Sequence, residues 1–182
     1  MSKRTKIKEA EHFLSKMKTE QDNRENFEFS LSAFLSAARS VLQYAFEEVK
    51  KAKTNEMKWY ESSVSGSSIV GYFKDKRDTN IHEEPIRPRK DFDITITESA
   101  GVKESLSAEI KRSDGKVEKK SILDDIETKQ KPKKSKASVV SKSTYRFNDW
   151  NGDDDVLTLC ESYVKELKKI VQDGVSKEFI ID

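Results

Sequence analysis

Apolar side chains recur every three to four residues in several stretches of this chain, which is the spacing of one face of an α-helix. The longest such stretch covers residues 27–51, where the large apolar residues share one arc at about 100° per residue. A shorter stretch, residues 5–18, has the same spacing. The serine-rich stretch 61–68 interrupts the pattern and is expected to form a loop or a frayed turn.

A third helix is expected to begin with Ser67 or Ser68 as its N-cap and to continue to Lys76 or beyond. It has to end before Pro85 and Pro88, because proline removes a backbone donor and restricts the preceding residue to extended geometry. Helical spacing joins Ile69, Val70, Phe73 and Arg77 on this segment.

The closing helix follows the acidic triplet 153–155, which supplies an N-cap and favourable charge at the helix N-terminus. Its apolar stripe includes Cys160, for which a small core residue is the simplest interpretation. Gly174 is expected to end this helix, since glycine is common just beyond helix C-termini. The stripe consists of Val156, Leu157, Cys160, Val164, Leu167, Ile170 and Val171.

Between residues 90 and 150 the period of the pattern changes to two. Phe92, Ile94 and Ile96 alternate with polar residues, which is typical of a half-buried strand. Segments 105–111 and 116–120 flank an Asp-Gly pair and predict a hairpin. Residues 138–147 predict another strand, and the lysine-rich stretch 129–136 predicts a linker.

These patterns together predict a mainly α protein, an up-and-down helical bundle with a small antiparallel β-rich insertion before the last helix (α+β overall). Three helices should precede the insertion, and one should follow it. The corresponding division is a bundle core at residues 1–89, an insertion at 90–150, and a C-terminal helix at 151–182 that returns to the bundle.

The amino-acid composition narrows the range of functions that this protein could have. Hydrophobic residues make up 34% of the chain and charged residues 37%, with a net charge of +2, so RNA contact would need a local basic patch. A single cysteine excludes a disulfide within the chain and a thiolate zinc site. The N-terminus lacks the apolar region of a signal peptide, and no apolar run approaches the roughly 18 residues of a membrane span. We expect a cytoplasmic protein with no membrane contact, no cofactor and no metal.

Residues 77–82 contain the most informative chemistry. Histidine is the side chain whose ordinary pKa lies between pH 5 and 8, and the chain has only two, His12 and His82. Arg77 and His82 would point about 140° apart on a continuous helix. They converge only if the helix ends between them or if a second copy supplies one of them. Asp78 precedes His82 by four residues and could orient its imidazole.

The segment Arg77-Asp78-Thr79-Asn80-Ile81-His82 resembles the motif of HEPN domains, in which a histidine follows an arginine and a polar residue. Residues 29–41 also look like the long helix of HEPN sequences. The resemblance covers residues 1–85 and the closing helix, and leaves out the β-rich insertion. It implies a HEPN-like bundle, a homodimer, and metal-independent endoribonuclease activity at the two-fold interface, as in toxins and antiviral nucleases, with a protein inhibitor or antitoxin as a possible partner.

In that reading the catalytic residues are His82 for proton transfer, Arg77 for the phosphate and Asp78 for orientation, with Arg39 and Asn80 in support. RNA is cleaved by its own 2′-hydroxyl, which leaves a cyclic phosphate. Relatives that a nucleotidyltransferase silences often carry a tyrosine two residues after the histidine. This chain has a glutamate at that position, so we do not expect that regulation.

Simpler interpretations stand beside this one. Arg77 and His82 could only cap a helix C-terminus, where cations are favourable, and Arg39 could pair with a loop carboxylate. Trp59 and Tyr60 could pack on the bundle or stack on a base. The alternative function is a non-catalytic, HEPN-like module that binds a protein or a nucleotide, and in that case Arg77 and His82 would diverge. A third possibility is that the insertion completes a partner's sheet through an exposed edge near residues 91–97.

Overall fold

The structure is a computed structural model that describes residues 2–51, 54–97, 107–111, 117–121 and 138–181. The described residues are mainly helical with short paired strands, which confirms the fold class predicted from the sequence. They form α1 (Lys3–Thr19), α2 (Arg24–Val49), α3 (Thr54–Ser65), α4 (Ser68–His82), β1 (Arg89–Thr97), β2 (Ser107–Lys111), β3 (Val117–Ser121), β4 (Ser138–Arg146) and α5 (Val156–Ser176).

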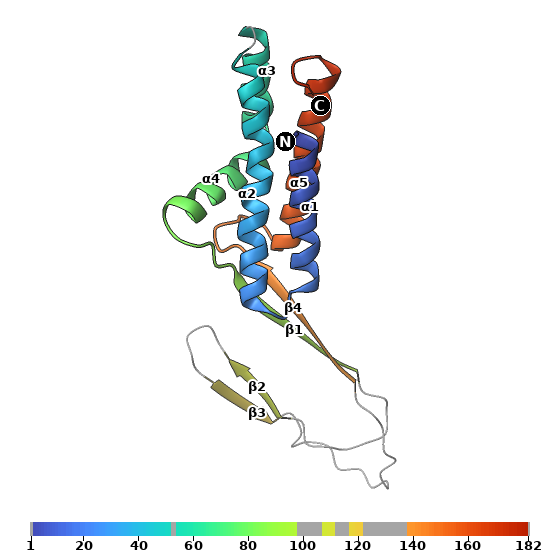
Figure 1. Cartoon of the computed structure of the whole chain (residues 1–182). Coiled ribbons are helices and arrows are strands. Elements are labelled where there is room, and N and C mark those ends of the chain that lie inside the picture. Colours follow the sequence, from blue (N-terminus) through green and yellow to red (C-terminus); the bar gives the residue numbers. More distant parts are fainter. Residues whose placement is uncertain (1, 52–53, 98–106, 112–116, 122–137, 182) are drawn as a thin grey trace. The chain divides into compact units, whose positions relative to one another are not determined.

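The chain divides into two compact units. The first contains residues 1–93 and 142–182, with all five of the described helices, and the second contains residues 94–141. In the first unit α1, α2 and α5 lie side by side (Figure 1). Every residue discussed below as part of a site belongs to this helical unit.

Burial of one face of α2 forms the centre of the helical unit. The residues that share its predicted arc are almost all buried, and each large one contributes roughly 1.5–3 kcal/mol to stability. Facing them are the buried stripes of α1 and α5. The buried residues of α2 are Phe27, Ser30, Leu31, Phe34, Leu35, Ala37, Ala38, Val41, Leu42, Ala45 and Val49.

The N-terminal helix and the C-terminal tail are fastened to α2 by one carboxylate. The ammonium of Lys3, only 2% exposed, lies 2.5 Å from Oε1 of Glu48. The backbone N–H of Ile181 donates to Oε2 of the same residue at 2.8 Å. A buried charge is tolerated only when it is paired, so Glu48 determines where both ends of the chain lie.

The prediction of a loop at 61–68 is wrong, because α3 continues through Ser65. Four helices therefore precede the insertion, where three were expected. Tertiary contacts outweigh the weak local pattern here. The indole of Trp59 donates to Oδ2 of Asp173 at 2.6 Å, and the phenol of Tyr60 donates to the Leu42 carbonyl at 3.1 Å. Both aromatic residues therefore have structural partners within the bundle.

Gly174 was predicted to end the closing helix, but α5 continues to Ser176 and Gly174 is a buried position inside it. A Cβ at Gly174 would lie 2.4 Å from the indole of Trp59 and 2.8 Å from the side chain of Ile180. Glycine is needed here because α3 and the C-terminal tail pack closely against α5, a requirement that the sequence of α5 alone does not reveal.

The four described strands form two pairs, β1 with β4 and β2 with β3. Strands β2 and β3 pair antiparallel, with Ser107 opposite Ser121 at one end and Lys111 opposite Val117 at the other. This is the pairing that the predicted hairpin requires. The Asp-Gly turn itself and the lysine-rich stretch 129–136 lie outside the described residues. Figure 1 shows β1 and β4 running in opposite directions.

The end of β4 and the residue after it contribute aromatic side chains to the bundle, although the sequence pattern places this stretch in the insertion. Tyr145 and Phe147 are buried in the main core. The ring of Tyr145 stacks on Phe27 with centroids 3.7 Å apart, and Phe147 meets Phe73 edge-on. Aromatic pairs of this kind add about 0.5–1.5 kcal/mol beyond their buried area.

The two helical glycines Gly174 and Gly71 form a matched pair for a stability test. Substitution Gly174→Ala should lower the free energy of unfolding by about 1–3 kcal/mol, because the new methyl group overlaps Trp59. Substitution Gly71→Ala should raise it by about 0.5–1 kcal/mol, since a Cβ there meets no atom within 4 Å. Urea unfolding followed by circular dichroism measures both, and equal effects would contradict the packing described here.

Candidate functional site

The motif residues lie on the last two turns of α4. Ser67 is the N-cap, as predicted, and the helix continues without a break to His82. The C-cap is Glu83, whose backbone N–H donates to the Thr79 carbonyl at 3.0 Å. Because the helix does not end between Arg77 and His82, the two side chains do not converge within one chain by that route.

The buried face of α4 determines where each motif side chain points. Val70 and Phe73 are almost fully buried and define the side that faces the bundle. At about 100° per residue, Arg77 lies close to that side and His82 lies opposite Phe73. In a single chain, therefore, Arg77 and His82 diverge. This is the geometry expected for a non-catalytic binding module.

Arg77 is partly buried and bonded to its neighbour in the chain. Its Nη1 donates to Oδ1 of Asp78 at 3.0 Å, and its side chain is 31% exposed. Its Nε is buried without a hydrogen-bond partner among the described residues. The guanidinium thus keeps unused donor capacity, while Asp78 contacts Arg77 in place of the expected contact with His82.

Asn80 has a structural role that explains its position. Its Nδ2 donates to Oγ of Ser32 at 2.8 Å, and its Oδ1 accepts from the backbone N–H of Ile86 at 3.1 Å. The amide thereby joins the end of α4 to α2 and to the chain leading into β1. Its hydrogen-bonding groups face the protein, so it holds the end of α4 in place.

The imidazole of His82 is exposed at the end of α4. Among the described residues it has no hydrogen-bond or ion-pair partner. Ile81 beside it is 47% exposed, which is unusual for an isoleucine. This end of the helix therefore presents an available proton-transfer group next to an uncovered apolar side chain.

Arg39 lies elsewhere, between α2 and the phenols of Tyr60 and Tyr163. Burial raises the pKa of Tyr60, and the guanidinium of Arg39 opposes that shift. Burial likewise raises the pKa of Tyr163, again with Arg39 in opposition. Among the described residues Arg39 has no carboxylate partner, so the expected loop salt bridge is not found there. The contacts of Arg39 are with α3 and α5 and do not involve Arg77 or His82.

A cavity of about 250 Å³ lies beside the motif, between α4, the segment 84–88 and residues 147–149. Its charges are largely compensated: the ammonium of Lys76 lies 2.6 Å from Asp149, over the rings of Tyr72 and Phe147. Burial raises the pKa of Tyr72, and Asp149 adds to that shift. Hydrogen bonds from Lys76 and Tyr72 lower the pKa of Asp149 against the effect of its own burial. This cavity is poorly suited to a phosphate.

Two other sequence interpretations are confirmed. Asp155 is the N-cap of α5, where its Oδ1 accepts from the Thr158 N–H at 2.7 Å. Cys160 is fully buried, and burial raises the pKa of its thiol, which leaves the thiol unreactive.

In the described part of the chain, no helix is both long and apolar enough to cross a bilayer.

The contrast between Asn80 and His82 can be tested by stability. Substitution Asn80→Ala should lower the free energy of unfolding by about 1–2 kcal/mol, because it removes two hydrogen bonds and leaves the Ile86 N–H without its acceptor. Substitution His82→Ala should change stability by less than about 0.5 kcal/mol, as expected for an exposed side chain without partners. A large loss in the His82 variant would show contacts that this geometry lacks.

Comparison of the chain with protein-family models, with curated proteins and with solved structures finds no match. The resemblance to HEPN domains therefore rests on the residues of the motif and of the long helix alone.

Proposed function

We propose that this protein is a HEPN-type, metal-independent endoribonuclease whose catalytic site forms only when two copies associate. The observation that carries the proposal is the exposed, unpaired imidazole of His82 at the end of α4, five residues after the partly exposed guanidinium of Arg77. One chain supplies both chemical groups on different sides of one helix. Two copies can bring the histidine of one chain to the arginine of the other.

His82 is suited to the proton transfers of this reaction. Attack of the ribose 2′-hydroxyl on the adjacent phosphorus requires a base that takes the hydroxyl proton, and an acid that protonates the departing 5′-oxygen. Histidine is the side chain used most often as a general acid and base, because one imidazole can both take up a proton and give one away. The products are a 2′,3′-cyclic phosphate and a 5′-hydroxyl, and DNA is spared because it lacks the attacking group.

Arg77 is suited to the charge that builds up on the phosphate oxygens. A guanidinium offers several N–H donors in one plane, and it stays charged at every pH relevant to the reaction. The partial burial of Arg77 restrains its position, and restrained donors stabilise a transition state more effectively than mobile ones. RNA phosphate would compete with Asp78 for Nη1, so substrate binding is expected to displace this neighbour.

The surface around the motif supports association of two copies. Phe29 is 64% exposed, and it lies one helical turn before Ser32, the residue that Asn80 contacts. With Ile81, it provides two uncovered apolar side chains at the junction of α2 and α4. The hydroxyls of Ser36 and Ser40 donate to carbonyls of their own helix, which leaves this face of α2 small and weakly polar. Such a face allows close helix packing.

A second candidate function is a non-catalytic module that binds a protein or a nucleotide. The observation in its favour is the divergence of Arg77 and His82 on an unbroken helix, together with the bond between Arg77 and Asp78. In this case His82 is a solvated helix end, and the exposed apolar residues serve a different partner.

The two candidates differ in an RNA cleavage assay in EDTA. Wild-type protein should cut a mixed RNA pool and leave cyclic phosphate ends, and His82→Ala should lower the rate by about 100-fold or more. The matched control is His12→Ala, which removes the other histidine, an exposed residue on α1, and should retain full activity. Intact RNA with the wild type, or equal rates with His82→Ala, would reject the nuclease in favour of the binding module.

Mixing two inactive variants tests whether the site is shared between copies. Chains carrying His82→Ala or Arg77→Ala should each be inactive alone. After mixing and refolding, random pairing makes half of the dimers mixed, each with one complete pair, so about a quarter of the wild-type activity should return. No recovery from the mixture, with an active wild type, would place both groups in one chain and contradict the shared site.

A further inference from the structure

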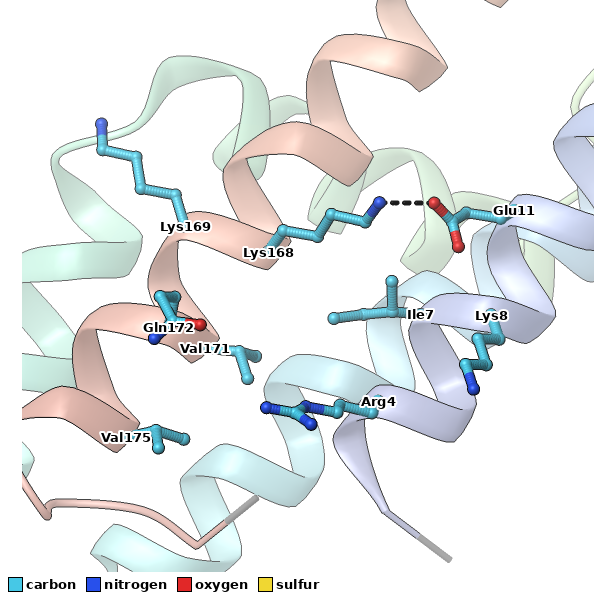
Figure 2. A pocket seen from close by; sticks show the side chains of 9 residues that line it. All are labelled: Arg4, Ile7, Lys8, Glu11, Lys168, Lys169, Val171, Gln172 and Val175. Carbon is cyan, nitrogen blue, oxygen red and sulfur yellow. Dashed lines mark hydrogen bonds and ion pairs between the residues drawn. The ribbon is translucent and has the colours of Figure 1, made fainter.

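A groove of about 570 Å³ lies between α1 and α5 in the helical unit, and neither the motif nor its neighbours line it. Figure 2 shows the side chains that line it. On each helix four lining residues follow the spacing i, i+3, i+4 and i+7 of one helical face, and α5 adds Lys169 beside that face. The contribution of α1 is Arg4, Ile7, Lys8 and Glu11.

The bottom of the groove is apolar. Ile7 from α1 and Val171 from α5 are about 5% exposed and belong to the main core, and Val175 packs against it. Because these side chains already pack below, only their upper surfaces remain for contact. An occupant therefore gains most by placing its own apolar side chains along this floor.

The rim of the groove is strongly basic. Its lining includes four cations, Arg4, Lys8, Lys168 and Lys169, against the single carboxylate of Glu11. That carboxylate lies 2.5 Å from the ammonium of Lys168, as the dashed line in Figure 2 marks, so the pair is compensated. Lys8 has no ion-pair partner among the described residues. Lys169 is 74% exposed and lies 3.6 Å from Glu166, outside hydrogen-bond distance.

We propose that this groove binds an amphipathic helix of a protein partner, with acidic residues flanking its apolar face. Two helices whose exposed residues follow the same spacing leave a channel into which a third helix packs along its length. The apolar face of the partner would cover Ile7, Val171 and Val175. Its carboxylates would meet Lys8 on one side and Lys169 on the other. This docking is independent of the proposed nuclease site, which lies on α4.

The lining distinguishes this occupant from other anionic ligands. Single-stranded RNA is usually held by cations together with aromatic side chains on which bases stack, and the groove is lined by no aromatic residue. Phosphates would use the rim and leave the apolar floor uncovered. An acidic amphipathic helix matches both parts of the groove, because its apolar stripe and its carboxylates have the same spacing as the lining.

The test uses a synthetic helical peptide of about 14 residues, long enough for four turns, with leucines on one face and glutamates on its flanks. Its fluorescence anisotropy is followed on titration with the full-length protein. A scrambled peptide of the same composition has equal charge but no apolar stripe. The amphipathic peptide should bind the wild type at least about tenfold more tightly than the scrambled one, and high salt should weaken it.

The double variant Lys8→Glu/Lys169→Glu should weaken peptide binding about tenfold or more, because the charge on each side of the groove changes sign. The matched control Lys74→Glu/Lys58→Glu makes the same change of net charge at exposed lysines on α4 and α3, and should bind like the wild type. Circular dichroism checks that both variants are folded. Equal loss in both variants would show a nonspecific charge effect and overturn the docking site.

Two further probes test whether the groove binds RNA or a membrane surface instead. Labelled oligouridine and vesicles of phosphatidylglycerol are titrated under the same conditions. If either binds the wild type more tightly than the peptide and loses binding in the Lys8/Lys169 variant, the groove serves RNA or a membrane surface, and the proposal is wrong. Failure of the peptide assay leaves RNA cleavage by His82 untouched, so the two proposals fail separately.

Discussion

Burial of the apolar face of α2 is the interaction on which the rest of the helical unit depends. Only 34% of the chain is hydrophobic, so the core is lean and a large part of it comes from this one helix. The other four described helices all contact α2. A helix surrounded in this way has little freedom to shift, and its neighbours take their positions from it. The structure therefore tolerates a highly charged surface, since stability comes from two buried apolar clusters to which α2 contributes.

The same constraint decides what the motif on α4 can do. Val70 and Phe73 must face α2 and α5, where Phe73 stacks on Tyr163 with ring centroids 4.6 Å apart. That packing sets the rotation of α4 about its own axis. Asn80 then holds the last turn against α2, so Arg77 points toward the bundle and His82 points away. The separation of the two groups in one chain therefore follows from how α4 packs on the bundle.

Polar contacts in this protein place the chain ends and connections, while apolar contacts supply most of the stability. Glu48 binds both Lys3 and the Ile181 N–H, and Asp173 accepts from Trp59 and Lys177. These hydrogen bonds lower the pKa of Asp173. With α1 and α5 held next to each other, their exposed faces form a basic groove that neither helix presents alone. The groove is therefore a product of tertiary packing between two helices that are far apart in the sequence.

The sequence by itself determined the long helices, the caps at Ser67 and Asp155, the buried Cys160 and the change to strands after residue 90, because periodicity and capping are local properties. It also singled out Arg77 and His82 as candidate site residues, a prediction that remains to be tested. Only the tertiary structure decided that 61–65 is helical, that Gly174 is a close-packing position, and that Asn80 is structural. It also decided that Arg39 lies apart from the motif and that α1 and α5 form a groove. Each of these depends on contacts between residues distant in sequence, which no local pattern contains.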